Sequence, residues 1–239
     1  MSFEMNNVSD RAEDYIKWVL SKYEEYLGEI YTNLSKNSWF FIGGLPSGAV
    51  IYEETGKVRE PTDIDIMIEG KFDFDAFPLG GNKISENRAG GIKWEPEYGI
   101  IIDLSDCSFI DNKYGTDDDC LKPTIEEYFR YADFDTNLIA LTSSRENFFE
   151  DGIARNAIKS GVIDIFYEEN NPEKGITMAR GIHISEKLDF KPGDGFIKFV
   201  KDNFSEKSES EIKEFLKDYK KFTGQYCEHI LRRLRQMKN

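Results

Sequence analysis

The stretch from Asp63 to Ile68, which reads Asp-Ile-Asp-Ile-Met-Ile, decides how the rest of the chain is interpreted. At the two-residue period of a β-strand, Ile64, Ile66 and Ile68 share one face, and Asp63 and Asp65 share the other. The isoleucine row predicts a strand that packs one face on a hydrophobic core. Neighbouring carboxylates repel each other, so the pair fits either a solvated edge strand or a site where a cation neutralises the charge.

Upstream of this strand, Trp39-Phe40-Phe41-Ile42 is a short apolar run that predicts a buried strand, and Gly43-Gly44 then predicts a tight turn. Leu45-Pro46-Ser47-Gly48 is expected to continue the turn, with a short helix from Ala49 to Glu54. The turn has two interpretations. In the first, the glycines simply provide the positive φ that a tight turn needs. In the second, this is an anion-binding turn in which Gly43, Gly44 and the Ser47 hydroxyl approach a phosphate.

Downstream, Lys93-Trp94 and the run from Gly99 to Leu104 predict the two arms of a hairpin around Pro96. Asp103 is the third carboxylate expected near Asp63 and Asp65. Asp106, three residues further on, would face the other side of a regular strand. Clustered carboxylates are the hard oxygen ligands that Mg²⁺ prefers, so Asp63, Asp65 and Asp103 are the candidate metal ligands and Mg²⁺ the candidate cofactor.

The remaining segments favour helices. One long helix is predicted from Asp10 to about residue 34, and Thr124 with Glu127 predicts a capping box. Further helices are expected over residues 151–160, 177–188 and 193–203, an apolar segment over 137–142, and a last helix from Ser208. The predicted fold class is α+β, with a mixed or antiparallel sheet flanked by helices and then an α-helical part. The expected domains are an N-terminal helix (1–35) that packs on a head (36–145), and a helical neck (146–239).

Composition narrows the class of protein. A hydrophobic content of 39% with 14% aromatic residues indicates a folded globule. The formal net charge of −14 opposes broad non-specific binding of nucleic acid. Cys107, Cys120 and Cys227 are widely spaced, which favours reduced thiols in a cytoplasmic protein. The segment Met1–Asn7 lacks the features of a signal peptide, and no apolar run is as long as a membrane span, so no membrane partner is expected.

Four stretches in this order resemble the DNA polymerase beta-like nucleotidyltransferase superfamily, closest to its class II tRNA nucleotidyltransferase and bacterial poly(A) polymerase branch. The strand with Gly43-Gly44, followed by the aspartate strand, is similar to the head signature. The stretch from Ala132 to Ala140 is similar to the nucleotide-binding motif Arg-Arg-Asp-Phe-Thr-x-Asn-Ala. Asp164 falls near the position of an Asp-containing turn of the family. The stretch from Ala179 to Phe190 resembles an arginine-bearing helix of the family.

The resemblance implies a metal-dependent enzyme that moves an NMP group from an NTP to a hydroxyl acceptor without a template. Asp63, Asp65 and Asp103 would be catalytic and would hold the metal. The nucleotide-binding residues implied are Gly43, Gly44, Ser47, Asp133, Asn137 and Arg180. The implied partners are ATP, CTP or both, and an RNA 3′ end that is tRNA-like.

Several family residues are replaced. Gly43-Gly44-Leu45-Pro46-Ser47-Gly48 stands where the family has Gly-Gly-x-Val-Arg-Asp, so the arginine and the aspartate are lost, and Tyr131-Ala132 replaces the two arginines before Asp133. His183 replaces a helix arginine, and no Glu-Asp-x-x-Arg motif occurs. These departures leave two alternatives open: transfer of NMP to a small molecule or a protein, and a binding protein that keeps the fold without catalysis.

Overall fold

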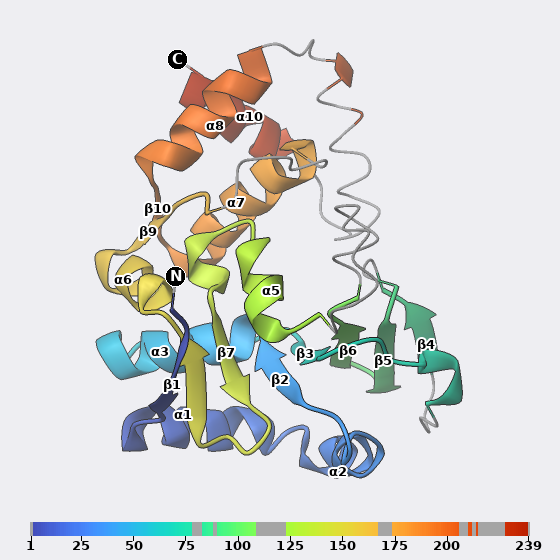
Figure 1. Cartoon of the computed structure of the whole chain (residues 1–239). Coiled ribbons are helices and arrows are strands. Elements are labelled where there is room, and N and C mark those ends of the chain that lie inside the picture. The colour runs from blue at the N-terminus through green and yellow to red at the C-terminus, as the bar shows by residue number, and fades with distance from the viewer. Residues whose placement is uncertain are drawn as a thin grey trace. The chain divides into compact units, whose positions relative to one another are not determined.

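The computed structural model describes residues 2–77, 83–87, 90–108, 123–166, 174–205, 210–211, 214 and 228–238. By chain contacts it divides into two compact units, the first made of Met1–Tyr131 and Asn137–Arg155, and the second of Ala132–Thr136 and Asn156–Asn239. The predicted α+β class is confirmed, because a mixed sheet flanked by helices is followed by further helices (Figure 1).

The elements of the first unit form one eight-stranded sheet and the helices around it. They are β1 (Glu4–Asn7), α1 (Asp10–Leu20), α2 (Glu24–Asn33), β2 (Trp39–Ile42), α3 (Gly44–Thr55), β3 (Ile64–Ile68), η1 (Phe74–Ala76), β4 (Lys83–Glu86), β5 (Ile92–Glu97), β6 (Ile100–Asp106), α5 (Ile125–Arg130), β7 (Ile139–Thr142) and β8 (Asn147–Glu150). The strand order is β1-β8-β7-β2-β3-β6-β5-β4, and every pair is antiparallel except β3 with β6.

The aspartate strand lies inside this sheet, between β2 and β6. Ile64, Ile66 and Ile68 are at most 1% exposed, as the period-two pattern predicts. On their side of the sheet, Tyr31 of α2 packs on Trp39 and Tyr26 of α2 packs edge-on against Trp94 of β5. The isoleucine face of β3 is therefore the core face.

The helix after Gly43-Gly44 differs from its prediction. α3 begins at Gly44, so the residues from Leu45 to Gly48 are helical rather than a continued turn. Pro46 is tolerated because it lies in the first helical turn, where a backbone N–H has no intrahelical partner. The helix ends at Gly56, whose φ of +72° suits a left-handed C-cap.

The N-terminal segment also differs from its prediction of one long helix. It forms the strand β1 and two helices, with a turn over residues 21–23 between α1 and α2. The turn lets both helices bury an apolar face, including Ile16 and Val19 of α1 and Leu27 and Ile30 of α2. Ser9 caps α1, because its hydroxyl accepts a hydrogen bond from the N–H of Ala12.

Residues 137–150 contribute strands that the sequence did not predict. β7 pairs with β2, and β8 pairs with both β7 and β1. Ahead of them, α5 carries the predicted capping box, in which the Thr124 hydroxyl accepts from the Glu127 N–H and the Glu127 carboxylate accepts from the Thr124 N–H. Phe129 of α5 stacks on Phe149 of β8, so α5 contacts this part of the sheet (Figure 1).

The second unit is mainly helical, as predicted. Its elements are η2 (Asp135–Asn137) and α6 (Ile153–Ser160), which both cross the unit boundary, and β9 (Val162–Ile163), α7 (Lys174–Leu188), β10 (Lys191–Pro192), α8 (Asp194–Ser205) and α10 (Glu228–Lys238). Its core is built from α7, α8 and α10 and includes Phe134, Met178, Phe196, Phe199 and Leu234. Most of the helix predicted from Ser208 lies outside the described residues.

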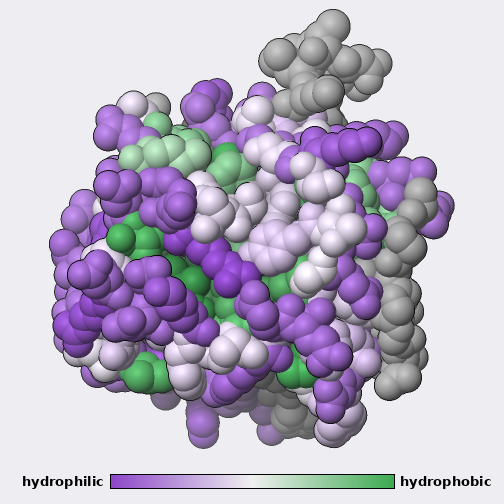
Figure 2. Space-filling model, turned by 90° about the horizontal axis from the view of Figure 1, so that it is seen from below, coloured by the Kyte–Doolittle hydropathy of each residue, from purple (hydrophilic) through white to green (hydrophobic). Residues whose placement is uncertain are grey.

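On the face shown in Figure 2, hydrophilic side chains predominate, and hydrophobic ones lie in small groups between them. No described helix is long and apolar enough to cross a membrane. Cys107 is a buried free thiol, whereas Cys120 and Cys227 lie outside the described residues.

Candidate active site

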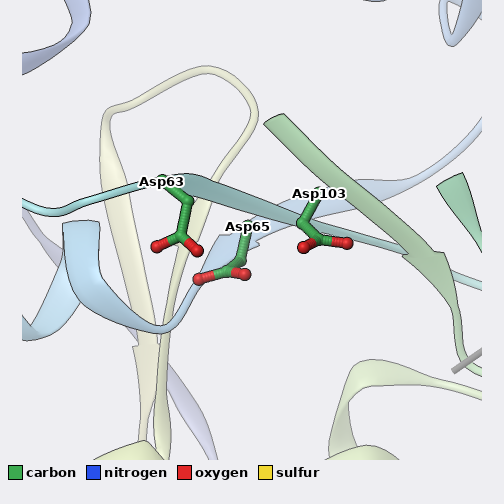
Figure 3. A group of neighbouring side chains, drawn as sticks. All are labelled: Asp63, Asp65 and Asp103. Atoms are coloured by element: carbon green, nitrogen blue, oxygen red, sulfur yellow. The ribbon is translucent and has the colours of Figure 1, made fainter. Parts of the chain in front are cut away.

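Three carboxylates converge on the sheet face opposite the isoleucine row. Asp63 comes from the segment that enters β3, Asp65 from β3, and Asp103 from β6 (Figure 3). Asp65 and Asp103 are direct neighbours in the parallel register of β3 and β6. One carboxylate oxygen of each residue lies within 4.8 Å of those of the other two, and all three side chains are half-buried. The structure therefore brings together the three residues that the sequence singled out as metal ligands.

Gly43 closes one side of this cluster. Its φ of +66° lies in a region that side-chain-bearing residues rarely adopt, and a Cβ built on it would lie 2.5 Å from the Asp65 carboxylate. Gly44 follows as the first residue of α3, where a Cβ would lie 3.1 Å from Pro61. The two glycines thus bring the start of α3 close to Asp65, and the positive end of the helix dipole favours negative charge there. Ser47 is buried in the first turns of the same helix.

Asn87 is a site residue that sequence reasoning missed. Its side-chain amide donates to Asp103 Oδ1 at 2.6 Å, to the Leu104 carbonyl at 2.9 Å and to Ser105 Oγ at 2.9 Å. Its side-chain oxygen accepts from the Gly91 N–H at 2.8 Å. Asn87, which follows β4, thus links β6 to Gly91, which precedes β5. Its hydrogen bond also fixes the position of the Asp103 carboxylate. The sequence signal was an Asn three residues before Gly90-Gly91, which is typical of any turn.

The electrostatics of Asp103 follow from these neighbours. Burial raises the pKa of its carboxyl above the usual value, and the charge of Asp63 adds to this rise, while the Asn87 hydrogen bond and the charge of Lys93 lower it. Lys93 faces Asp103 across the antiparallel pair of β5 and β6. Partial burial and a neighbouring like charge both disfavour the ionised form, so a cation bound by the cluster would stabilise it.

Two other acidic positions lie outside the cluster. Asp106 is 6% exposed, and its carboxylate accepts from the backbone N–H groups of Phe72 and Ser108 and from the Ser108 hydroxyl. It therefore ties together the loops at the end of β6. Asp73 belongs to the second Asp-x-Asp of the chain, Asp73-Phe74-Asp75, and caps the short helix η1 by accepting from the Asp75 N–H.

The residues of the second predicted group fall in different units. Asp133 is buried and pairs with the guanidinium of Arg180 on α7 in the second unit. Asn137 is half-buried at the end of η2 and belongs to the first unit. The structure brings Asp133 and Arg180 together within one unit, and their binding of a nucleotide stays a prediction.

Asp164 has a structural role in the second unit. Its carboxylate accepts from the N–H groups of Gly195 and Phe196, at 3.2 and 2.5 Å, in the first turn of α8. A Cβ on Gly193 would strike the same carboxylate at 2.5 Å. Asp164 thus caps the start of α8, although the two are far apart in the sequence. This structural role accounts for the position of Asp164 next to a turn. Beside it, Asp135 accepts from the N–H groups of Thr136 and Asp164, and burial raises its pKa to about 6.

Comparisons with known proteins were made for the sequence and for the fold. No protein-family model matches the sequence, and no curated protein matches it. Among solved structures, a CCA-adding enzyme in complex with ATP matches with a TM-score of 0.63 and 17% identity, over 99% of this chain and 54% of that chain. The Thermotoga maritima CCA-adding enzyme complexed with tRNA matches with a TM-score of 0.63 and 16% identity, over 99% of this chain and 55% of that one.

A tRNA-processing enzyme complex is a weaker match, with a TM-score of 0.53 and 16% identity, over 89% of this chain and 57% of that one. The chain shares its fold with these enzymes, consistent with the resemblance to the nucleotidyltransferase superfamily. It spans a little over half of the length of the solved structures that it matches.

Proposed function

We propose that this chain is a metal-dependent, template-independent nucleotidyltransferase that moves an NMP group from an NTP, ATP or CTP, to a hydroxyl acceptor. The observation that carries the proposal is the cluster of Asp63, Asp65 and Asp103, whose oxygens lie within 4.8 Å of one another beside the Gly43 turn. The fold shared with CCA-adding enzymes supports it. In this proposal residues 36–145 form the catalytic head, 146–239 the neck, and 1–35 a segment that packs on the head.

The donor set fits a hard divalent ion. The cluster offers carboxylate oxygens only, from β3, from the residue that precedes it and from the neighbouring β6, and oxygen donors suit Mg²⁺ or Mn²⁺. Asp63, Asp65 and Asp103 would hold the ion, which when bound activates the attacking hydroxyl and neutralises charge on the phosphates. Gly43 and Gly44 leave room for a phosphate to approach the backbone, and Asp133, Asn137 and Arg180 are the proposed contacts for the rest of the nucleotide.

The favoured acceptor is an RNA 3′ end that is tRNA-like, because the structures with the same fold include one complexed with tRNA. A small molecule or a protein is the second candidate acceptor. The specific observation in its favour is the formal net charge of −14, which repels an RNA backbone.

Incubation of the purified chain with each labelled NTP and Mg²⁺, with and without a pool of small RNAs, tests the proposal. Label in RNA that disappears with EDTA is the expected result. Label on a low-molecular-weight product or on protein would favour the second acceptor class. The proposed activity is contradicted if the folded chain transfers label to none of the acceptors, with Mg²⁺ or with Mn²⁺.

A further inference from the structure

A row of polar side chains extends the carboxylate cluster toward the edge of the sheet. Strand register places Ser85 of β4 opposite Lys93 of β5, Lys93 opposite Asp103 of β6, and Asp103 opposite Asp65 of β3. Directly opposed residues of neighbouring strands lie on the same face. The flanking β5 residues, Ile92 and Trp94, are buried on the other face.

Lys93 is the cation that this row sets beside the cluster. Its side chain is half-buried, and its charge acts on Asp103. Within the described part of the chain, Lys93 forms no hydrogen bond or ion pair of its own through its side chain. Glu95, two residues along on the same strand face, accepts from the Gly99 N–H of the hairpin turn at 3.3 Å.

We propose that Lys93 binds a phosphate group of the NTP, with the Ser85 hydroxyl beyond it along the same row. This inference rests on the proposed function and adds a substrate contact to it. A divalent ion held by carboxylates completes its coordination with phosphate oxygens, so the anion nearest Asp103 is the polyphosphate. The Gly43 turn supplies backbone N–H groups there and no cationic side chain. Among the side chains that the structure describes, Lys93 is the cation whose charge acts on Asp103.

The first test is binding of inorganic tripolyphosphate at saturating Mg²⁺, followed by calorimetry, which needs neither an acceptor nor turnover. Lys93→Met is expected to weaken binding about 10- to 100-fold, the range for a hydrogen bond between charged groups. Lys93→Arg, which keeps the charge, should retain most of the affinity. Lys36→Met, at an exposed position after α2, makes the same change in net charge and should leave binding unchanged.

Three results would overturn the inference. In the first, Lys93→Met binds tripolyphosphate as tightly as the wild type and binds Mg²⁺ more tightly. This result would mean that Lys93 only neutralises the charge of Asp103. Another is weaker binding of a short RNA with tripolyphosphate binding unchanged, which would assign Lys93 to the acceptor strand. The third is the absence of any tripolyphosphate binding by the wild-type chain.

The proposed function fails separately from this inference. Tripolyphosphate binding that depends on Lys93, without NMP transfer to any acceptor, would support the phosphate contact and contradict the nucleotidyltransferase. NMP transfer that persists at the wild-type rate and NTP affinity in Lys93→Met would support the nucleotidyltransferase and contradict the contact.

Discussion

Asp65 lies at the centre of the candidate site because three separate elements meet at its carboxylate. Asp63 precedes it on the same face, Asp103 faces it from β6, and Gly43 gives it room at the start of α3. The pair at 63 and 65 was predictable from period-two spacing, and Asp103 from the same spacing on a second apolar strand. Asn87 was not predictable, because its partners lie 16 to 18 residues away on another strand.

Asp65→Asn should abolish the stabilisation of the chain by Mg²⁺. At a Mg²⁺ concentration of 100 times Kd, binding contributes about 2.7 kcal/mol, which corresponds to a rise in Tm of roughly 5–10 °C for a chain of this size. Without metal, the variant should melt at the wild-type temperature or slightly higher, since a like-charge contact is relieved. Thermal melts with Mg²⁺ and with EDTA measure both effects.

Asp75→Asn is the matched control for this variant, because Asp75 is exposed and belongs to the second Asp-x-Asp of the chain. It should keep the full Mg²⁺-dependent rise in Tm. An equal rise in Asp65→Asn and in the wild type would show that the metal binds elsewhere.

Asn87→Ala should shift metal binding to higher pH. The Asn87 hydrogen bond lowers the pKa of Asp103, against the upward effect of burial. Its loss raises that pKa, so protons compete with Mg²⁺ at higher pH than in the wild type. Mg²⁺-dependent stabilisation, followed by thermal melts between pH 5 and 8, measures the shift. The exposed Asn37→Ala serves as control, and identical pH profiles for Asn87→Ala and the wild type would exclude this role.

At the scale of elements, the turn between β2 and α3 determines how close the helix start comes to Asp65. The apolar run and the two glycines predicted this strand and turn, but they did not predict that α3 begins at Gly44. Local sequence favoured a turn over Leu45-Pro46-Ser47-Gly48, and the packing of α3 on β2, β3 and β7 overrides it. The strands β1, β7 and β8 were missed for a related reason: each has four residues, and the pairing of β1 with β8 and of β7 with β2 joins segments far apart in the chain.

Gly43→Ala should lower both stability and metal binding. A side-chain-bearing residue at φ +66° costs about 1–3 kcal/mol, and the new Cβ would displace the Asp65 carboxylate 2.5 Å away. Gly99→Ala is the matched control, because Gly99 has φ +84° with nothing within 4 Å of an added Cβ. Both variants should melt below the wild type, but only Gly43→Ala should lose the Mg²⁺-dependent rise in Tm. Loss of that rise in Gly99→Ala as well would indicate a general effect of backbone strain.

The raised pKa of Asp135 should make the stability of the second unit depend on pH. Its pKa is about 6 in the folded chain and near 3.8 when unfolded, so between these values the folded state binds more protons. The free energy of unfolding therefore falls as pH rises from about 4 to 6 and is level above that. Asp135→Asn keeps the acceptor oxygen and removes the charge. The difference in Tm between wild type and variant should follow this curve, and a difference that does not change with pH would refute the assignment.

At the scale of the whole molecule, the chain shares its fold with the matched CCA-adding enzymes, but other residues replace several arginines that the resemblance implies. It spans a little over half of the CCA-adding enzymes that share its fold. Its motif order was sufficient to predict the α+β class and the helical second part. The assignment of Asp133 and Asn137 to different units was not predictable, because it depends on the packing of residues 132–136 within the second unit, which is otherwise built from residues after 155.

We expect the chain to discriminate weakly between the four NTPs. Tyr131 and Ala132 stand where the resemblance has arginines, so paired hydrogen bonds to base edges are lost, and stacking tolerates any base. We expect mixed additions, or repeated addition of one nucleotide, when a tRNA lacking its 3′ end is incubated with all four NTPs. Sequencing of the products measures this, and faithful C-C-A addition would contradict it.

The central claim is that Asp63, Asp65 and Asp103 together form the catalytic centre of a nucleotidyltransferase. The most direct measurement is the initial rate of transfer of α-labelled NMP in Mg²⁺, compared between wild type, Asp65→Asn and Asp75→Asn. We predict a fall of at least about 10³-fold in Asp65→Asn, because the bound metal is worth several kcal/mol in the transition state and about 1.4 kcal/mol is tenfold in rate. Asp75→Asn should transfer label at the wild-type rate. Equal rates in wild type and Asp65→Asn would contradict the claim.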